Sequence, residues 1–118
     1  AISTYNQYAG SYNYVGEKDN IAFSFLRQAV AVDANTIRIY NTGNENLDLV
    51  ANEGLKIHLN EDNTLTLEGW DKMAVTEGSG TYDPQTKTFS LDFKYKDAGG
   101  AEHTVVGTLV SATGTTEE

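Results

Sequence analysis

The chain of 118 residues contains no cysteine and only one proline, one methionine and one tryptophan. The absence of cysteine excludes a disulfide framework, a zinc site built on thiolates and a cysteine nucleophile. A chain of this length forms one domain that buries about 65% of its unfolded surface, so it needs neither a disulfide nor a metal to fold. No apolar run approaches the ~18 residues that a membrane-spanning helix requires.

Basic residues are also few, because 8 Lys and Arg stand against 17 Asp and Glu, for a formal net charge of −9. This charge repels a nucleic acid at long range, and no run of basic residues offsets the repulsion. It equally disfavours docking on an anionic lipid surface. We therefore expect no nucleic-acid partner, no direct membrane contact and a monomer that stays in solution.

Strand-like alternation is what the sequence has in quantity, and residues 78–96 show it best. One parity of this segment is apolar and the other is polar, so a strand here has one buried and one solvent-facing side. The apolar set is Phe89, Leu91, Phe93 and Tyr95, and the polar set is Ser90, Asp92, Lys94 and Lys96. Before this alternating run, the Asp83 side chain can accept a hydrogen bond from the backbone amide two residues on, and Pro84 fixes its own φ angle. Together they predict a tight turn. The segment is an antiparallel hairpin.

The rest of the chain repeats this pattern, with short alternating runs between polar turns. Further strands are predicted at 8–15, 21–32 with a kink near Arg27 and Gln28, 37–40, 55–59, 64–70, 73–82 and 103–110, and the turns include 16–20 and a loop at 41–46. No segment has a helical period. We predict an all-β domain at 1–111, an antiparallel up-and-down meander of about eight strands forming a lipocalin-like barrel or sandwich, with a flexible tail at 112–118.

Trp70 is the first candidate binding residue. In an unbroken strand it lies on the opposite side from Leu65 and Leu67, and so faces solvent. An exposed tryptophan is typical of a stacking platform for sugar rings or of a partner surface. The alternative is a bulge at Gly69 that turns the indole into the core.

Three polar or aromatic neighbours complete this candidate site. Tyr40 lies on the polar parity of its strand beside Arg38, and Glu68 shares the parity of Trp70. Tyr12 and Tyr14, by contrast, are expected to face the core against the Phe89 side of the hairpin. The predicted ligand-binding residues are therefore Trp70, Tyr40, Arg38 and Glu68.

Other chemistry-bearing residues have simpler explanations. The acidic turn at 60–63 lacks the spacing of a calcium loop and suits a hairpin turn. His58 and His103 are 45 residues apart, each within an alternating strand, and form neither an HxH nor an HExxH motif. No nucleophile elbow or dinucleotide-binding glycine motif is present. We expect no metal, no cofactor and no enzymatic activity.

The hairpin motif resembles a recurrent pattern near the C-terminus of small β-domains in secreted Bacteroidetes lipoproteins. The matching residues are Gly78, Gly80, Tyr82, Asp83, Pro84, Thr86, Lys87, Phe89, Leu91 and Tyr95, with Phe93 where a tyrosine is often seen. The upstream Gly10, Tyr12 and the strand that starts at Asn63 are also similar to these domains. Several of them have no known function, and some are encoded beside glycan-uptake systems. The resemblance implies export, a lipid anchor upstream of Ala1, and a place at the outer membrane, cell surface or periplasm.

Three hypotheses follow. The first is a non-enzymatic accessory or glycan-binding domain of an exported surface lipoprotein, whose partner is a glycan or another surface protein. The second is a lipocalin-like carrier that holds a small apolar ligand inside the barrel. Its lining would be Ile21, Phe23, Phe25, Leu65, Leu67, Phe89, Leu91 and Phe93. The third is a purely structural or partner-docking domain.

Overall fold

The computed structural model describes residues 6–40 and 53–112, and in them the chain forms eight antiparallel strands. They are β1 (Gly10–Lys18), β2 (Ile21–Asp33), β3 (Thr36–Tyr40), β4 (Glu53–Leu59), β5 (Leu65–Asp71), β6 (Ala74–Asp83), β7 (Thr88–Lys96) and β8 (Glu102–Ser111). The predicted loop at 41–46 lies outside the described residues. Ala112 still donates its amide to the carbonyl of Ser11 at 2.8 Å, and the remainder of the predicted tail also lies outside.

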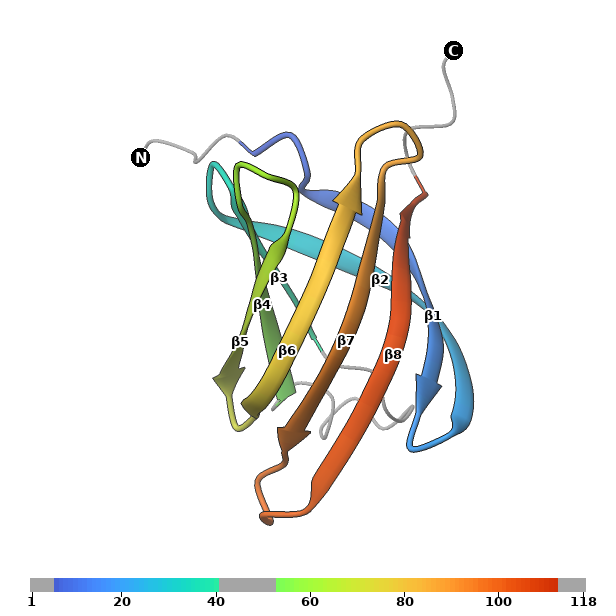
Figure 1. Ribbon diagram of the computed structural model, residues 1–118, viewed down its shortest axis with the longest axis vertical. Coiled ribbons are helices and arrows are strands. Elements are labelled where there is room, and N and C mark those ends of the chain that lie inside the picture. Colours follow the sequence, from blue (N-terminus) through green and yellow to red (C-terminus); the bar gives the residue numbers. More distant parts are fainter. Residues whose placement is uncertain (1–5, 41–52, 113–118) are drawn as a thin grey trace.

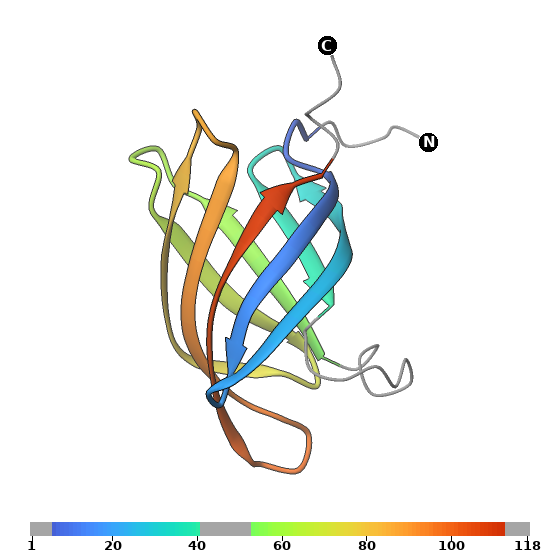
Figure 2. The same cartoon turned by 90° about the vertical axis from the view of Figure 1, so that its right-hand side faces the viewer.

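All eight strands belong to one sheet that curls into a nearly closed barrel (Figure 1). Their order in the sheet is β5-β4-β3-β2-β1-β8-β7-β6, so neighbours in sequence pair everywhere except between β5 and β6. The first and last strands pair instead, and Figure 2 shows β8, β1 and β2 side by side. The prediction of an all-β up-and-down meander is confirmed, and it takes the barrel form.

The seam between β5 and β6 is closed mainly by side-chain packing. Apart from an isolated bridge between Thr64 and Thr81, the described residues show no ladder there. Leu65 and Leu67 of β5 lie against two glycines of β6. A Cβ added to Gly80 would come within 2.8 Å of Leu65 Cδ1, and one added to Gly78 within 3.1 Å of Leu67 Cβ. The glycines therefore let the leucines seat directly on the β6 backbone.

The core confirms the alternation predicted for the hairpin. Phe89, Leu91, Phe93 and Tyr95 are buried, and the residues between them are exposed. Tyr12 and Tyr14 are buried as well, and the rings of Tyr12 and Phe89 meet edge to face with centroids 5.7 Å apart. The predicted turn is also confirmed, because Gln85 donates its amide to Asp83 Oδ1 at 2.9 Å.

Two local predictions were wrong. The turn expected at 16–20 contains only Asp19 and Asn20, both with positive φ, because a two-residue hairpin of that geometry suits the sheet twist and lets β1 run on to Lys18. The kink expected near Arg27 does not occur, since β2 keeps its register with β1 from Ile21 to Ala29. Arg27 remains on the inward parity, with its guanidinium carbon 4.5 Å from the ring centroid of Phe25.

Candidate functional site

Strand pairing brings Arg38, Glu68 and Trp70 together on the outer side of the barrel. Arg38 of β3 pairs with Lys56 of β4, which pairs with Glu68 of β5. One row along, Gly54 of β4 pairs with both Tyr40 and Trp70. The side chain of Tyr40 lies outside the described part of the structure. We call the outer side of β3, β4 and β5 the tryptophan face, defined by Arg38, Lys56, His58, Glu68 and Trp70.

Trp70 lies on this face because β5 contains no bulge. The register between β4 and β5 is unbroken from Glu53–Asp71 to Leu59–Leu65, so Gly69 does not turn the indole inward. The half-buried ring occupies the space above Gly54, where a Cβ would come within 1.8 Å of Trp70 Cε3. The guanidinium carbon of Arg38 lies 4.5 Å from the ring centroid, a cation–π contact. Sequence parity placed Trp70 on the outer side, and the structure adds its contact with Arg38.

A hollow of about 320 Å³ lies beside this pair on the same side of the sheet. Its lining combines carboxylates, an amine, an imidazole and hydroxyls: Val32, Asp33, Thr36, Lys56, His58, Thr66 and Glu68. Lys56 and Glu68 are cross-strand neighbours, yet within residues 6–40 and 53–112 they form no ion pair with each other. The hollow therefore presents both hydrogen-bond donors and acceptors to a ligand.

Hydrogen bonds fix one end of the hollow. Thr36 Oγ1 and His58 Nδ1 are 2.7 Å apart, and Asn6 Nδ2 donates to the carbonyls of Asp33 (2.6 Å) and Thr36 (3.0 Å). Asp33 Oδ1 accepts the amide of Asn35 at 2.9 Å. This bond, with help from the Thr36 hydroxyl, holds the pKa of the exposed Asp33 carboxyl below its ordinary value. Asp33 is thus ionised at neutral pH.

Sequence reasoning missed Lys56, His58, Thr66 and Asp33. The first three carry a signal, because they lie on the polar parity of their strands, as Arg38 and Glu68 do. These residues lie together because their strands are neighbours in the sheet. Parity alone does not reveal which strands are neighbours. Gly54 gave no signal, since its role is to leave room for an indole from the next strand.

The two other candidates in the sequence have structural roles. At 60–63, Asp62 Oδ1 accepts from the amide and the hydroxyl of Thr64, at 3.0 and 2.6 Å, as a turn residue does. His103 of β8 is half-buried between Asp19 (Nδ1–Oδ2 2.7 Å) and Asp97 (Nε2–Oδ2 2.8 Å). Burial lowers the pKa of His103, but the hydrogen bonds to the two carboxylates outweigh it and raise the pKa overall. The described residues include no group of three His, Asp or Glu side chains able to hold a metal.

Most residues proposed to line an apolar ligand site belong to the packed interior. Leu65, Phe89, Leu91 and Phe93 are members of the buried core, and Phe23 and Leu67 pack against it. Phe25 is half-buried and stacks on Phe23 with centroids 5.8 Å apart. Ile21 was wrongly included: it begins β2, at the end of the barrel, and is 71% exposed.

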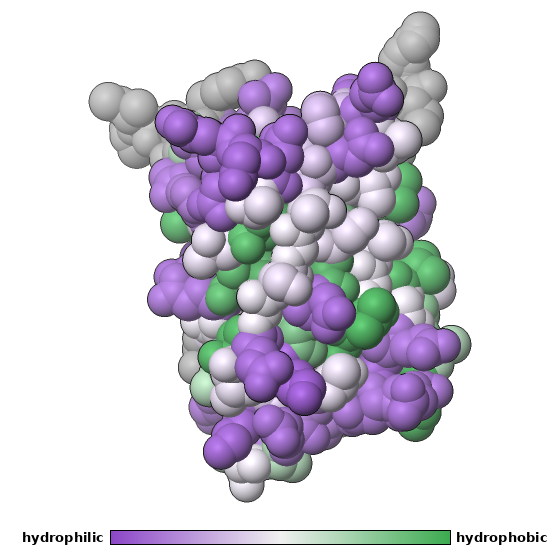
Figure 3. Space-filling model, in the orientation of Figure 1, coloured by the Kyte–Doolittle hydropathy of each residue, from purple (hydrophilic) through white to green (hydrophobic). Residues whose placement is uncertain are grey.

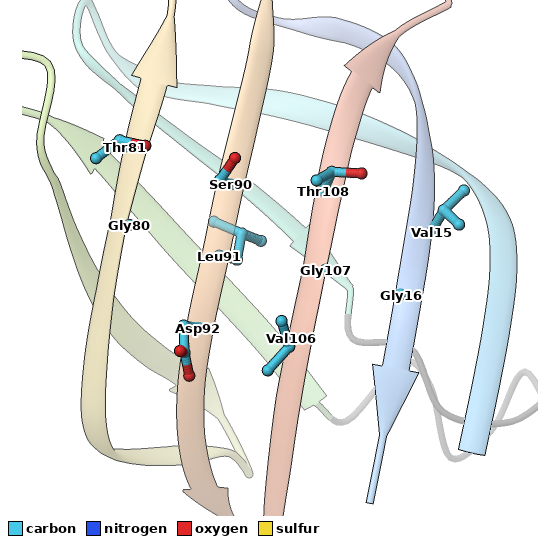
Figure 4. Close-up of a pocket in the computed structure, with 10 residues that line it drawn as sticks. All are labelled: Val15, Gly16, Gly80, Thr81, Ser90, Leu91, Asp92, Val106, Gly107 and Thr108. Carbon is cyan, nitrogen blue, oxygen red and sulfur yellow. The ribbon is translucent and has the colours of Figure 1, made fainter. Parts of the chain in front are cut away.

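A second hollow, of about 460 Å³, lies across β6, β7, β8 and β1 (Figure 4). Val15 and Val106 contribute apolar surface there, and Thr81, Ser90, Asp92 and Thr108 contribute most of the polar groups. Figure 3 shows apolar side chains in the middle of the face drawn in Figure 1, between hydrophilic ends. None of the four residues predicted to bind a ligand on the tryptophan face lines this second hollow. In the part of the chain that is described, no helix is long and apolar enough to span a membrane.

Comparisons with known proteins identify relatives of this fold. A family model described as "-like, C-terminal" matches residues 1–110. A protein of unknown function from Bacteroides ovatus has a similar structure, with a TM-score of 0.74, 12% identity and coverage of 95% of this chain and 44% of that one.

Two other Bacteroides ovatus structures are also similar. One is a multidomain protein including DUF1735 (TM-score 0.53, 18% identity, 91% of this chain and 57% of that one). The other is a protein of unknown function (TM-score 0.54, 18% identity, 91% and 48%). The chain thus spans about half the length of these structures, and at such identities the likeness concerns the fold. None of the curated proteins matches the sequence.

Proposed function

Since the chain belongs to the "-like, C-terminal" family, we propose that it is a non-enzymatic accessory domain of a longer exported protein and binds glycan through the tryptophan face. The observation that carries the proposal is the Trp70–Arg38 pair beside a polar hollow. Aromatic rings pack on the CH surfaces of sugars, while charged and hydroxyl side chains bond the sugar hydroxyls. In this proposal, Arg38, Lys56 and Glu68 contact sugar hydroxyls next to the indole.

The cellular context is part of the same proposal. The similar structures come from Bacteroides ovatus, and this chain covers 44%, 57% and 48% of them. We place the domain at the outer membrane, the cell surface or in the periplasm, held by a lipid anchor upstream of Ala1. It acts as a monomer without nucleic acid, and its partner is a glycan or another surface protein.

A glycan array with the purified domain tests the proposal. We expect binding to a restricted set of oligosaccharides, and we expect the Trp70→Ala variant to lose at least about tenfold in affinity, because stacking on an aromatic ring supplies on the order of 1 kcal/mol or more. Ser90→Ala, on the outer side of β7, is the control and should bind as the parent does. Retained affinity in Trp70→Ala, in a variant shown to be folded by circular dichroism, would remove the tryptophan face from the proposal. An array without any hit would refute glycan binding.

A further inference from the structure

We propose that the tryptophan face selects an uncharged, hydroxyl-rich glycan and rejects sugars that carry carboxylate or sulfate groups. This inference rests on the proposed function and specifies the ligand class of the same site. Three properties support it: the positions of the two carboxylates at the hollow, the positions of the nearby cations, and the negative net charge of the whole chain.

The carboxylates lie at opposite sides of the hollow. Asp33 is the last residue of β2, and Glu68 lies on the outer side of β5. Both are exposed, and the amide of Asn35 fixes the Asp33 carboxylate at 2.9 Å. A carboxylate accepts hydrogen bonds from hydroxyls strongly, since a charged acceptor strengthens the bond. An anionic sugar would instead bring its own charge between these two groups.

The cations near the two carboxylates do not give the site a net positive charge. Lys56 is the one ammonium in the lining, and it has Glu68 directly across on β5. The Arg38 guanidinium lies over the Trp70 ring, next to the hollow but not in its lining. The remaining lining groups are Val32, two threonines and His58. Two carboxylates against one ammonium leave the hollow itself slightly negative, and counting the neighbouring Arg38 brings the formal sum to zero, so no net positive charge attracts an anion.

The charge of the whole chain acts in the same direction. At a formal net charge of −9, the domain repels a polyanion before contact, whereas an uncharged chain approaches without this penalty. Repulsion of this kind weakens as salt screens it. Binding of the ligand should therefore change little with ionic strength.

The test is an array that carries neutral oligosaccharides together with uronic-acid and sulfated ones. We expect hits among the neutral glycans only, with affinities that stay within about twofold between 50 and 500 mM salt. Hits confined to acidic glycans, lost in Trp70→Ala, would overturn this inference and leave the proposed function standing. An array with no hit at all would overturn the proposed function itself.

Matched variants locate the selectivity in the two carboxylates. Glu68→Gln and Asp33→Asn each keep the shape of the side chain and remove its charge, so each should weaken binding of a neutral hit about tenfold or more. Asp92→Asn, on the outer side of β7 away from this hollow, is the control and should leave the affinity unchanged. Unchanged affinity in both Glu68→Gln and Asp33→Asn, with melting temperatures equal to the parent, would overturn the assignment.

Discussion

Trp70 and Gly54 are matched in size across β4 and β5. The indole fills the place that any larger residue at 54 would need, and this close seat keeps the ring beside Arg38. Gly54 has no side chain, and the space this leaves determines the orientation of Trp70. The shape of the tryptophan face depends on this fit as much as on the aromatic ring.

Substituting Gly54 by alanine should displace the indole. The new Cβ would come 1.8 Å from Trp70 Cε3 in the present geometry, so the ring must move outward, at a cost of about 1–3 kcal/mol in the free energy of unfolding. Trp70 fluorescence should shift to the red and become easier to quench with iodide. Gly99→Ala is the control, because a Cβ there meets its nearest neighbour at an ordinary 3.6 Å. An unchanged emission spectrum in Gly54→Ala would mean that the ring is not held as described.

Among the elements, His103 links two turns that are far apart in sequence. It bonds Asp19 in the β1–β2 turn and Asp97 in the β7–β8 turn, at the same end of the barrel. Hydrogen bonds to His103, reinforced by backbone amides, hold the pKa of both Asp19 and Asp97 below the ordinary value. The pKa of the histidine is raised, although the nearby Lys18 ammonium works against the rise.

These opposite pKa shifts predict a range of pH in which the His103 interactions stabilise the folded protein most. A histidine with a raised folded-state pKa stabilises fully below its unfolded pKa of about 6.5, and this effect disappears as the pH rises through the folded pKa. The carboxylates stabilise above about pH 3.9 and cease to do so as the pH falls through their depressed pKa values. The melting temperature of the parent should therefore exceed that of His103→Gln most at about pH 5, and the difference should shrink at pH 9. A difference that stays constant from pH 5 to 9 would contradict the ion pairs.

Sequence reasoning succeeded where the information is local. The alternation of Phe89 to Tyr95 fixes which side chains are buried, and Asp83 with Pro84 marks the turn before them. It failed near Arg27 and Gln28, where a kink was expected, because the contact of Arg27 with Phe25 and its β1 neighbours are not visible in sequence. Arg38, Glu68 and Trp70 were predicted from parity and residue type and lie on one face, but Lys56 and Asp33 join them only through cross-strand neighbours, which parity does not reveal.

At the scale of the whole molecule, the barrel is held unevenly around its circumference. Every pair of neighbouring strands shares a ladder except β5 and β6, where leucines rest on glycines. Backbone amides at this seam, apart from the Thr64–Thr81 bridge, lack the protection of a neighbouring strand. The nearly closed barrel therefore has one seam, between β5 and β6, that backbone hydrogen bonds hold less firmly than the other strand pairs.

Amide hydrogen exchange should be faster at the β5–β6 seam than elsewhere in the sheet. Amides of β5 and β6 that face the seam should exchange at least about tenfold faster than those of β7, which has ladder partners on both sides, since exchange follows the local opening free energy. Two-dimensional NMR after transfer to D₂O measures each amide separately. Equal protection along all three strands would show that side-chain packing seals the seam as firmly as a ladder does.

The pairing of β1 with β8 has a consequence for how the chain can be connected. Because Ala112 bonds Ser11, the start of β1 lies beside the end of β8, while the natural connection between β5 and β6 joins strands without a ladder. The order of strands in the chain is thus a circular permutation of their order in the sheet. A gene rearranged to begin after the exposed Lys72, with the old ends linked, would encode a ribbon in which each strand pairs with the next from first to last.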